Sequence, residues 1–160
     1  MSAASVRPPK TTRHLELLLA MARGEHPLPP VAVLVGFTFA EFAVGHAVTE
    51  METGPRHANP MGTLHGGIVC DLADAAMGTA MATTLEDDES FTTVDLGAKY
   101  LKPVWTARLR ATADVVKRTR ALGLVECSVT DETGSLVARA NSTCLVLRGE
   151  DARGRSVPRR

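Results

Sequence analysis

Residues 66–84 read GGIVCDLADAAMGTAMATT and form the longest helical pattern in the chain. The stretch contains no proline, and its apolar residues recur at helical spacing. These residues are Ile68, Leu72, Ala75, Ala76, Ala80 and Met81. Alanine and glycine supply much of the rest, so we expect this helix to lie close against a sheet.

Strand patterns lie on both sides of this helix. Segment 106–116 alternates apolar with polar residues, as a strand with one buried face does. Segment 92–101 alternates likewise, and its apolar face is expected to hold Val94, Leu96, Ala98 and Tyr100. Further strands are expected at 122–130 and 136–147, and an earlier pair at 36–52 that bends at Gly45. One long helix among antiparallel strands predicts an α+β fold, with a helix on one face of a single sheet.

The two ends of the chain differ from this central part. Leu15, Leu18, Leu19 and Ala22 predict a helix, which the proline-rich segment 26–30 ends. Residues 1–10 are expected to be disordered, and the arginine-rich residues after Leu147 to be a solvated tail. The sequence thus divides into an N-terminal extension with one helix (1–35), a main domain (36–147) and a flexible Arg-rich tail (148–160).

Composition argues against several classes of partner. Lysine and arginine number 18, as do aspartate and glutamate, so no strongly basic field is available for a nucleic acid. The longest apolar run, 31–35, is far too short to span a membrane, and the N-terminus lacks the order of a signal peptide. The three cysteines form no CxxC pair, which makes a reducing cytoplasm the default. We therefore expect a cytoplasmic protein without nucleic acid or membrane partners.

Motifs of several enzyme classes are missing from the sequence. It has no GxSxG, no GxxxxGK[ST] and no GxGxxG after a strand. The five histidines show no HExxH or paired metal spacing, so neither a metal nor a cofactor is expected. Cys70, which lies beside alanine and leucine on the predicted helix, is expected to be a buried packing thiol.

The most informative residues run from Asn59 to Gly67 and directly precede the long helix. Gly66 and Gly67 weaken a helix start, but they allow a ligand to approach the backbone closely. The first-turn N–H groups carry partial positive charge and can bind an oxyanion or a polarised carbonyl. A tight turn without a ligand explains the two glycines equally well.

Asp74 is the second unusual feature, because it lies two turns into a helix made mostly of alanine, methionine and leucine. Asp71 lies one turn earlier on the same face, and Gly67 and Gly78 extend that stripe. The face lacks the lysine, arginine and glutamate that usually fill a wet helix surface. A functional carboxylate and a plain solvated face are both consistent with this pattern.

The chain resembles the hotdog-fold acyl-CoA thioesterases of the PaaI-like branch. The match consists of Asn59-x-x-Gly62-x-x-His65-Gly66-Gly67 with Leu72-Ala73-Asp74, followed by Thr93-Val94-Asp95-Leu96, Tyr100-Leu101-Lys102-Pro103 and Val129-Thr130-Asp131. It covers about residues 36–147. The resemblance implies a sheet wrapped around the long helix and a homo-oligomer, either a dimer or a dimer of dimers. The active site would lie at the dimer interface.

The resemblance also implies catalytic roles on an acyl-CoA substrate. Asp74 would act as nucleophile or general base, facing the helix N-terminus of the partner. Gly66 would offer its N–H to the thioester carbonyl. Asn59 would help hold the carbonyl or the attacking water, Thr93 would orient that water, and His65 would mainly shape the turn.

Further residues would bind the substrate. Gly67 and Thr92 belong to this group, and the basic run at Lys117, Arg118 and Arg120 is a candidate for the coenzyme A phosphates. The run carries Thr119 where many relatives carry glycine, and it is consistent with a solvated turn as well.

Two other functions fit the same fold. A non-catalytic module could bind acyl-CoA as a sensor or carrier, although such a module gains nothing from Asp74. A hotdog enoyl-CoA hydratase or dehydratase would need an acid/base pair, for which His65 and Asp74 are available.

Overall fold

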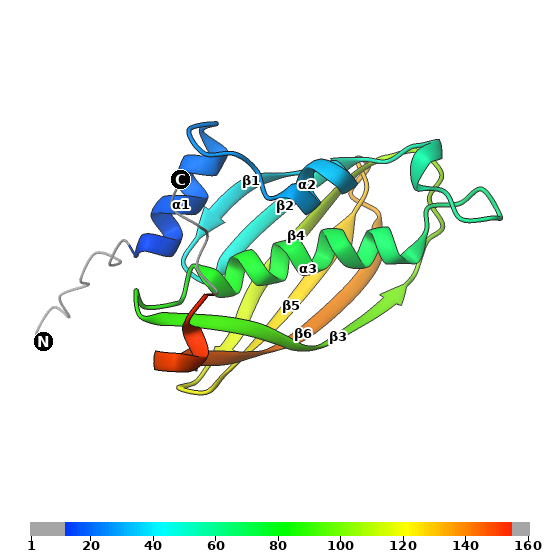
Figure 1. Ribbon diagram of the computed structural model, residues 1–160. Helices are drawn as coiled ribbons and strands as arrows, with labels where there is room; N and C mark the ends of the chain where they lie inside the picture. The colour runs from blue at the N-terminus through cyan, green and yellow to red at the C-terminus, as the bar shows by residue number, and fades with distance from the viewer. Residues whose placement is uncertain (1–11, 155–160) are drawn as a thin grey trace, which may run out of the picture.

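The computed structural model describes residues 12–154, in which a six-stranded antiparallel sheet wraps around one long helix (Figure 1). The strand order is β1-β2-β4-β5-β6-β3. The strands are β1 (Phe37–Ala43), β2 (His46–Glu52), β3 (Glu89–Tyr100), β4 (Arg108–Arg118), β5 (Leu122–Thr130) and β6 (Leu136–Arg148). The helices are α1 (Arg13–Ala22), α2 (Pro30–Val35) and α3 (Gly66–Ala82), with short 3-10 turns η1 (Pro55–His57) and η2 (Gly149–Ala152). The expected α+β hotdog fold is confirmed.

Helix α3 supplies the centre of the core. Leu72, Ala76, Met77 and Ala80 are fully buried between α3 and the sheet. Each large apolar side chain buried there contributes about 1.5–3 kcal/mol, and the alanines allow the close approach that the sequence predicted. The hydroxyl of Thr49 on β2 donates to the carbonyl of Leu72 at 3.0 Å, which ties the helix to the sheet.

The alternation predicted for the later strands is confirmed in β4 and β5. Leu109, Ala111 and Ala113 point into the core from β4, and Cys127 and Val129 do so from β5. The expected bend of the first strand pair is also present. Gly45 joins β1 to β2 with φ of 75°, a conformation that favours glycine.

The alternation expected in β3 is wrong at one point. The pairing of β3 with β6 shifts between Thr93 and Asp95, so Val94 is the extra residue of a β-bulge and is 61% exposed. A bulge reverses the phase of the side chains along a strand. Thr93 therefore faces α3, as Leu96 and Ala98 do beyond the bulge, and Val94 does not join the apolar face.

The N-terminal extension contains two helices where the sequence predicted one. The unexpected helix, α2, begins at Pro30, which suits a first helical position because proline has a preset φ and no N–H to leave unpaired. Its six residues are too few for a periodic pattern. Buried His57 fixes the end of α2, since its Nε2 lies 3.0 Å from the carbonyl of Val35.

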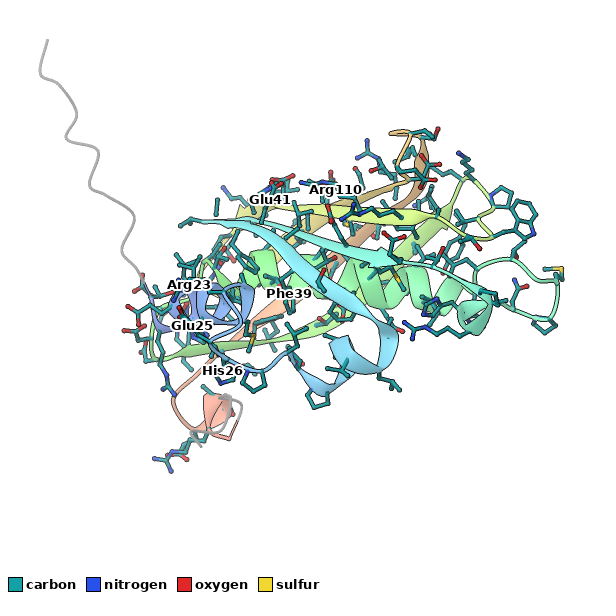
Figure 2. All side chains as sticks on the ribbon, turned by 90° about the horizontal axis from the view of Figure 1, so that it is seen from above. Arg23, Glu25, His26, Phe39, Glu41 and Arg110 are labelled. Atoms are coloured by element: carbon teal, nitrogen blue, oxygen red, sulfur yellow. The ribbon has the colours of Figure 1, made fainter. Side chains whose placement is uncertain are left out.

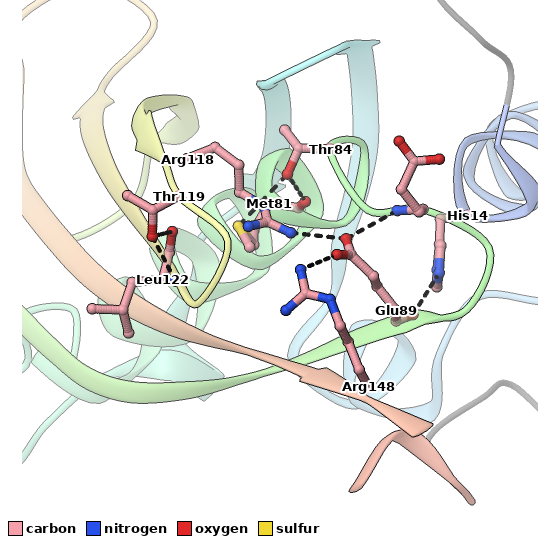
Figure 3. Close-up of polar contacts among 9 residues, drawn as sticks. His14, Met81, Thr84, Glu89, Arg118, Thr119, Leu122 and Arg148 are labelled. Atoms are coloured by element: carbon pink, nitrogen blue, oxygen red, sulfur yellow. Dashed lines mark hydrogen bonds and ion pairs between the residues drawn. The ribbon is translucent and has the colours of Figure 1, made fainter. Parts of the chain in front are cut away.

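Helix α1 lies at the end of the domain where α3 ends and β3 begins (Figure 1). There, an ionic cluster centres on buried Glu89, which pairs with Arg118 and Arg148 (Figure 3). His14 of α1 contacts the backbone carbonyl of Glu89 at 3.0 Å. Burial alone would raise the pKa of Glu89, but the Glu86 amide and the two guanidinium groups outweigh it and lower that pKa.

The outer face of the sheet carries a second, exposed set of ion pairs. Arg110 on β4 lies between Glu41 on β1 and Glu50 on β2, and Figure 2 shows Glu41 and Arg110 side by side. Because these groups remain in contact with water, each pair contributes less to the free energy of unfolding than the buried Glu89 cluster does.

The expected disorder of residues 1–10 lies outside the described residues, as does the end of the predicted tail. The described part of that tail has regular secondary structure, contrary to the flexible tail that the sequence predicted. Arg148 is the last residue of β6, and η2 follows it.

Candidate active site at the uncovered face of α3

One face of α3 is not covered by the sheet. Gly67, Asp71 and Asp74 are exposed on it, and Gly78 is half-buried. These are the residues of the stripe that the sequence indicated. Strand β3 runs antiparallel to α3 beside this face, so residues late in β3 lie near the start of the helix (Figure 1).

Asp74 and Thr93 meet across α3 and β3. Thr93 Oγ1 lies 3.5 Å from Asp74 Oδ1, at the long end of hydrogen-bond distances. Partial burial of the carboxylate by the helix and strand raises the pKa of Asp74; the Thr93 hydroxyl lowers it, and the negative charge of Asp71 raises it further. The net upward direction brings this carboxylate closer to the pKa of an effective general base.

His65 caps the N-terminus of α3. Its Nδ1 accepts the backbone N–H of Gly67 at 2.9 Å, which places its ring proton on Nε2. The Gly67 amide is therefore already hydrogen-bonded within the chain. The Gly66 amide is different: among residues 12–154 no hydrogen bond from it is found, and it remains available as a donor.

Tyr100 contacts the first turn of α3, and sequence reasoning missed this contact. Its hydroxyl donates to the Gly66 carbonyl at 3.0 Å and lies 3.1 Å from the Cys70 thiol. Tyr100 lies on the face of β3 that holds Leu96 and Ala98, as the alternation predicted, but its ring is 55% exposed. Cys70 is correspondingly half-buried at this contact, and the expectation of a buried packing thiol is wrong.

Asn59 organises the loop before α3. Its Nδ2 donates to Thr63 Oγ1 at 2.8 Å, and its Oδ1 accepts the amide of Met61 at 2.9 Å. Backbone bonds between the same segments close the turn, in which Gly62 has φ of 83°. This local hydrogen-bonding pattern is typical of asparagine in turns.

A single chain does not bring all the predicted catalytic residues together. Asp74 and Thr93 are in contact, but Gly66 lies two turns away on the same helix. At about 1.5 Å per residue, eight residues of helix separate Gly66 from Asp74 by roughly 12 Å. One thioester carbonyl cannot contact both groups of the same chain.

The residues predicted to bind substrate are dispersed. Thr92 neighbours Thr93 on β3 and therefore points to the opposite face of that strand. Arg118 turns inward to Glu89 at 2.8 Å, so its guanidinium is committed to the ionic cluster (Figure 3). Lys117 and Arg120 are exposed around the β4–β5 turn.

The part of the chain that is described contains no group of three or more His, Cys, Asp or Glu side chains arranged to hold a metal ion. Within the same residues, no helix is long and apolar enough to cross a membrane.

Comparison with known proteins places these features in a family. Residues 61–138 match the family model described as the thioesterase superfamily. Human acyl-coenzyme A thioesterase 13 is 31% identical over 113 residues, covering 69% of this chain and 80% of that protein. A 1,4-dihydroxy-2-naphthoyl-CoA hydrolase from Listeria monocytogenes is 28% identical over 112 residues, with 70% and 91% coverage.

Solved structures agree with this result. A phenylacetic acid degradation-related protein from Ralstonia eutropha superimposes with a TM-score of 0.74 at 29% identity, covering 81% of this chain and 98% of that one. A mutant of the phenylacetic acid degradation protein PaaI from Thermus thermophilus gives a TM-score of 0.68 at 29% identity, with 73% and 98% coverage. The chain therefore belongs to the hotdog-fold thioesterase superfamily, in its PaaI-like branch, and is a thioester hydrolase.

Proposed function

We propose that this protein hydrolyses acyl-CoA thioesters to a free acid and coenzyme A, with Asp74 as the catalytic carboxylate. The observation that carries the proposal is the pairing of Asp74 with Thr93 on the uncovered face of α3. The names of two relatives support the substrate class, since one is an acyl-coenzyme A thioesterase and the other a naphthoyl-CoA hydrolase.

The reaction needs a group that attacks or activates water and a donor for the developing oxyanion. As a general base, Asp74 takes a proton from water while the water oxygen bonds to the thioester carbon. The oxyanion that forms accepts the Gly66 N–H at the positive end of α3. Collapse breaks the C–S bond, and the thiolate leaves and takes the proton back. As a nucleophile, Asp74 would instead form a mixed anhydride that water then hydrolyses.

A second copy of the chain would supply the missing donor. The roughly 12 Å between Gly66 and Asp74 along α3 exceeds the 3–3.5 Å within which reacting groups must lie. An isologous dimer places a residue of one copy against a different residue of the other, twice over. Asp74 of each copy would then face Gly66 of its partner.

Strand β3 is suited to form this dimer. Among the described strands it pairs only with β6, so its other edge is open. Along this strand, Tyr100 contacts Gly66 of α3, and Thr93 contacts Asp74 of α3. A two-fold axis crossing β3 midway between them, near Leu96 and Gly97, would pair the two β3 edges antiparallel. It would also place Gly66 of one copy beside Asp74 of the other.

The remaining assignments are part of the same proposal. Thr93 orients the attacking water, Asn59 holds the loop that carries the helix N-terminus, and His65 fixes the first turn. Lys117 and Arg120 are the exposed cations left for the coenzyme A phosphates. Gly67 and Thr92 would contact substrate, Thr92 from the opposite face of β3. A cytoplasmic location and a dimer of dimers also remain proposals.

A panel of aromatic, short-chain and long-chain acyl-CoA thioesters, with detection of the released thiol, tests the function. We expect Asp74→Asn to lower kcat at least 100-fold while fold and assembly are retained, because the variant loses the base or nucleophile. Asp88→Asn, which removes an exposed carboxylate from the turn before β3, is the matched control. Wild-type kcat/KM in Asp74→Asn on a well-hydrolysed substrate would refute the assignment.

Two further measurements separate the competing readings. Tight acyl-CoA binding without thiol release by wild type would favour the non-catalytic module, and hydration of an enoyl-CoA without thiol release would favour the hydratase. A single turnover in ¹⁸O-water tests the nucleophilic role of Asp74. Label in the Asp74 carboxylate requires an anhydride intermediate opened at the aspartyl carbon, whereas direct attack by water puts label only in the acid product.

A further inference from the structure

Tyr100 occupies a position that determines how the two glycines at the start of α3 are held. A Cβ built on Gly66 would lie 2.9 Å from both the Cζ and the hydroxyl oxygen of Tyr100. A side chain at position 66 would therefore require the Tyr100 ring to move out of this space. The contact joins the end of β3 to the first turn of α3.

The peptide group between Gly66 and Gly67 is held at both of its polar atoms. Its carbonyl oxygen accepts the Tyr100 hydroxyl at 3.0 Å, and its N–H donates to Nδ1 of His65 at 2.9 Å. The preceding peptide is fixed as well, because the His65 carbonyl accepts the amide of Ile68 at 3.0 Å. These bonds leave the Gly66 N–H as the free donor of this turn.

Adjacent glycines need such restraint. Glycine loses more conformational freedom than any other residue when it is ordered, so two adjacent glycines weaken a helix start. An oxyanion donor is effective when it points at the developing charge before the reaction begins. A Gly66–Gly67 turn without external contacts would have to be ordered in each catalytic cycle.

We propose that Tyr100 is a positioning residue that pre-organises the Gly66 N–H as the oxyanion donor by clamping the Gly66–Gly67 peptide against His65. The inference rests on the proposed function, in which Gly66 binds the thioester oxygen. The Cys70 thiol lies 3.1 Å from the Tyr100 hydroxyl, which donates to the Gly66 carbonyl, so the three groups form one chain of hydrogen bonds.

The chemistry of the hydroxyl suits this role. The hydrogen bond with Cys70, together with partial burial, raises the pKa of Tyr100 to about 12. The hydroxyl therefore stays protonated and keeps donating throughout the pH range in which a thioesterase operates. The ring is 55% exposed in the single chain, so loss of the hydroxyl should cost little folding stability.

Tyr100→Phe is the sharpest test, because it keeps the ring on Gly66 and removes only the hydroxyl. Deleting a whole oxyanion donor costs about 10²–10³ in kcat, so loosening one should cost about tenfold. We expect KM to change less than about twofold, since the Gly66 bond strengthens in the transition state. Trp105→Phe, a substitution at another exposed aromatic five residues away, is the control.

Amide hydrogen exchange provides a readout that does not depend on activity. We expect the Gly67 amide to exchange faster in Tyr100→Phe while the amides of β4 and β5 keep their wild-type rates. If wild type hydrolyses no acyl-CoA, the proposed function fails, but this measurement still decides whether Tyr100 holds the turn. A folded Tyr100→Phe with kcat within twofold of wild type and unchanged Gly67 exchange overturns the proposal.

Cys70→Ala is the second variant if Tyr100→Phe does not fold. It removes the thiol that contacts the Tyr100 hydroxyl, without touching Gly66. We expect kcat to fall about two- to threefold, because the chain of hydrogen bonds is weakened but not broken. Wild-type kcat together with wild-type exchange at Gly67 in Cys70→Ala would count against the clamp.

Discussion

Thr93 on β3 directs its hydroxyl at the carboxylate of Asp74 on α3, with 3.5 Å between Oγ1 and Oδ1. The β-bulge at Val94 makes this contact possible, since it lets Thr93 face the helix while the rest of the strand keeps its apolar residues on the core. The pair connects the sheet edge to the proposed catalytic group.

Removing the Thr93 hydroxyl should shift the pH dependence of the reaction. The hydroxyl lowers the pKa of Asp74, so Thr93→Val should raise that pKa and move the acid limb of the kcat/KM profile to higher pH. We also expect kcat/KM at neutral pH to fall about two- to tenfold as the water loses a partner. Thr38→Val removes an exposed hydroxyl from β1, away from the site, and an equal effect there would contradict the role of Thr93.

Removing the charge of Asp71 should shift the pH profile of kcat/KM in the opposite direction. Its charge raises the pKa of Asp74, so Asp71→Asn should lower that pKa and move the acid limb to lower pH. Asp71→Glu keeps the charge and should leave the limb close to that of wild type. The full pH profile of kcat/KM on one acyl-CoA tests both variants; a limb that stays in place in Asp71→Asn would show that the two carboxylates do not interact.

The proposed dimer makes a prediction about residue register. An axis midway between Thr93 and Tyr100 pairs residue 94 of one copy with residue 99 of the other. Val94→Cys combined with Lys99→Cys should therefore form a covalent dimer on mild oxidation, because both positions are exposed on β3. Each single variant is the control, since neither pairs with itself. A double variant that is dimeric by light scattering yet fails to cross-link would rule out this register.

Glu89 should contribute far more to stability than the exposed Glu41. Glu89→Gln leaves Arg118 and Arg148 without a negative partner at a buried site, and we expect the free energy of unfolding to fall by about 2–4 kcal/mol. Glu41→Gln breaks an exposed pair with Arg110 and should cost about 0–1 kcal/mol. Urea denaturation of both variants measures the difference, and equal losses would contradict the contrast.

Regular elements with long periodic patterns were predictable from the sequence. The helix expected at 66–84 is α3, and the segments expected at 106–116 and 122–130 are β4 and β5. These segments were predictable because burial of one face shows in the hydrophobicity of their successive residues. Helix α2 was missed because the five apolar residues after Pro30 have no period to detect.

The candidate site was predictable only in part. The sequence singled out Asp74 as a carboxylate within a mostly apolar helix. The Gly and Asp stripe around it is the uncovered face of α3. It could not show that Arg118 turns inward to Glu89, because a charge run looks the same whether its side chains face solvent or a buried acid. Nor could it show the Val94 bulge, which depends on the pairing of β3 with β6.

By itself, the sequence determined the helix, most of the strands and the family, and it indicated the residues that we propose for the chemistry, because those properties lie in local periodicity and in motif chemistry. Only the tertiary structure decided which groups meet: Thr93 with Asp74, and Tyr100 with Gly66. Both contacts join residues far apart in the chain. They exist because β3 lies antiparallel to α3 and changes phase at a bulge, and no local pattern in the sequence encodes that alignment.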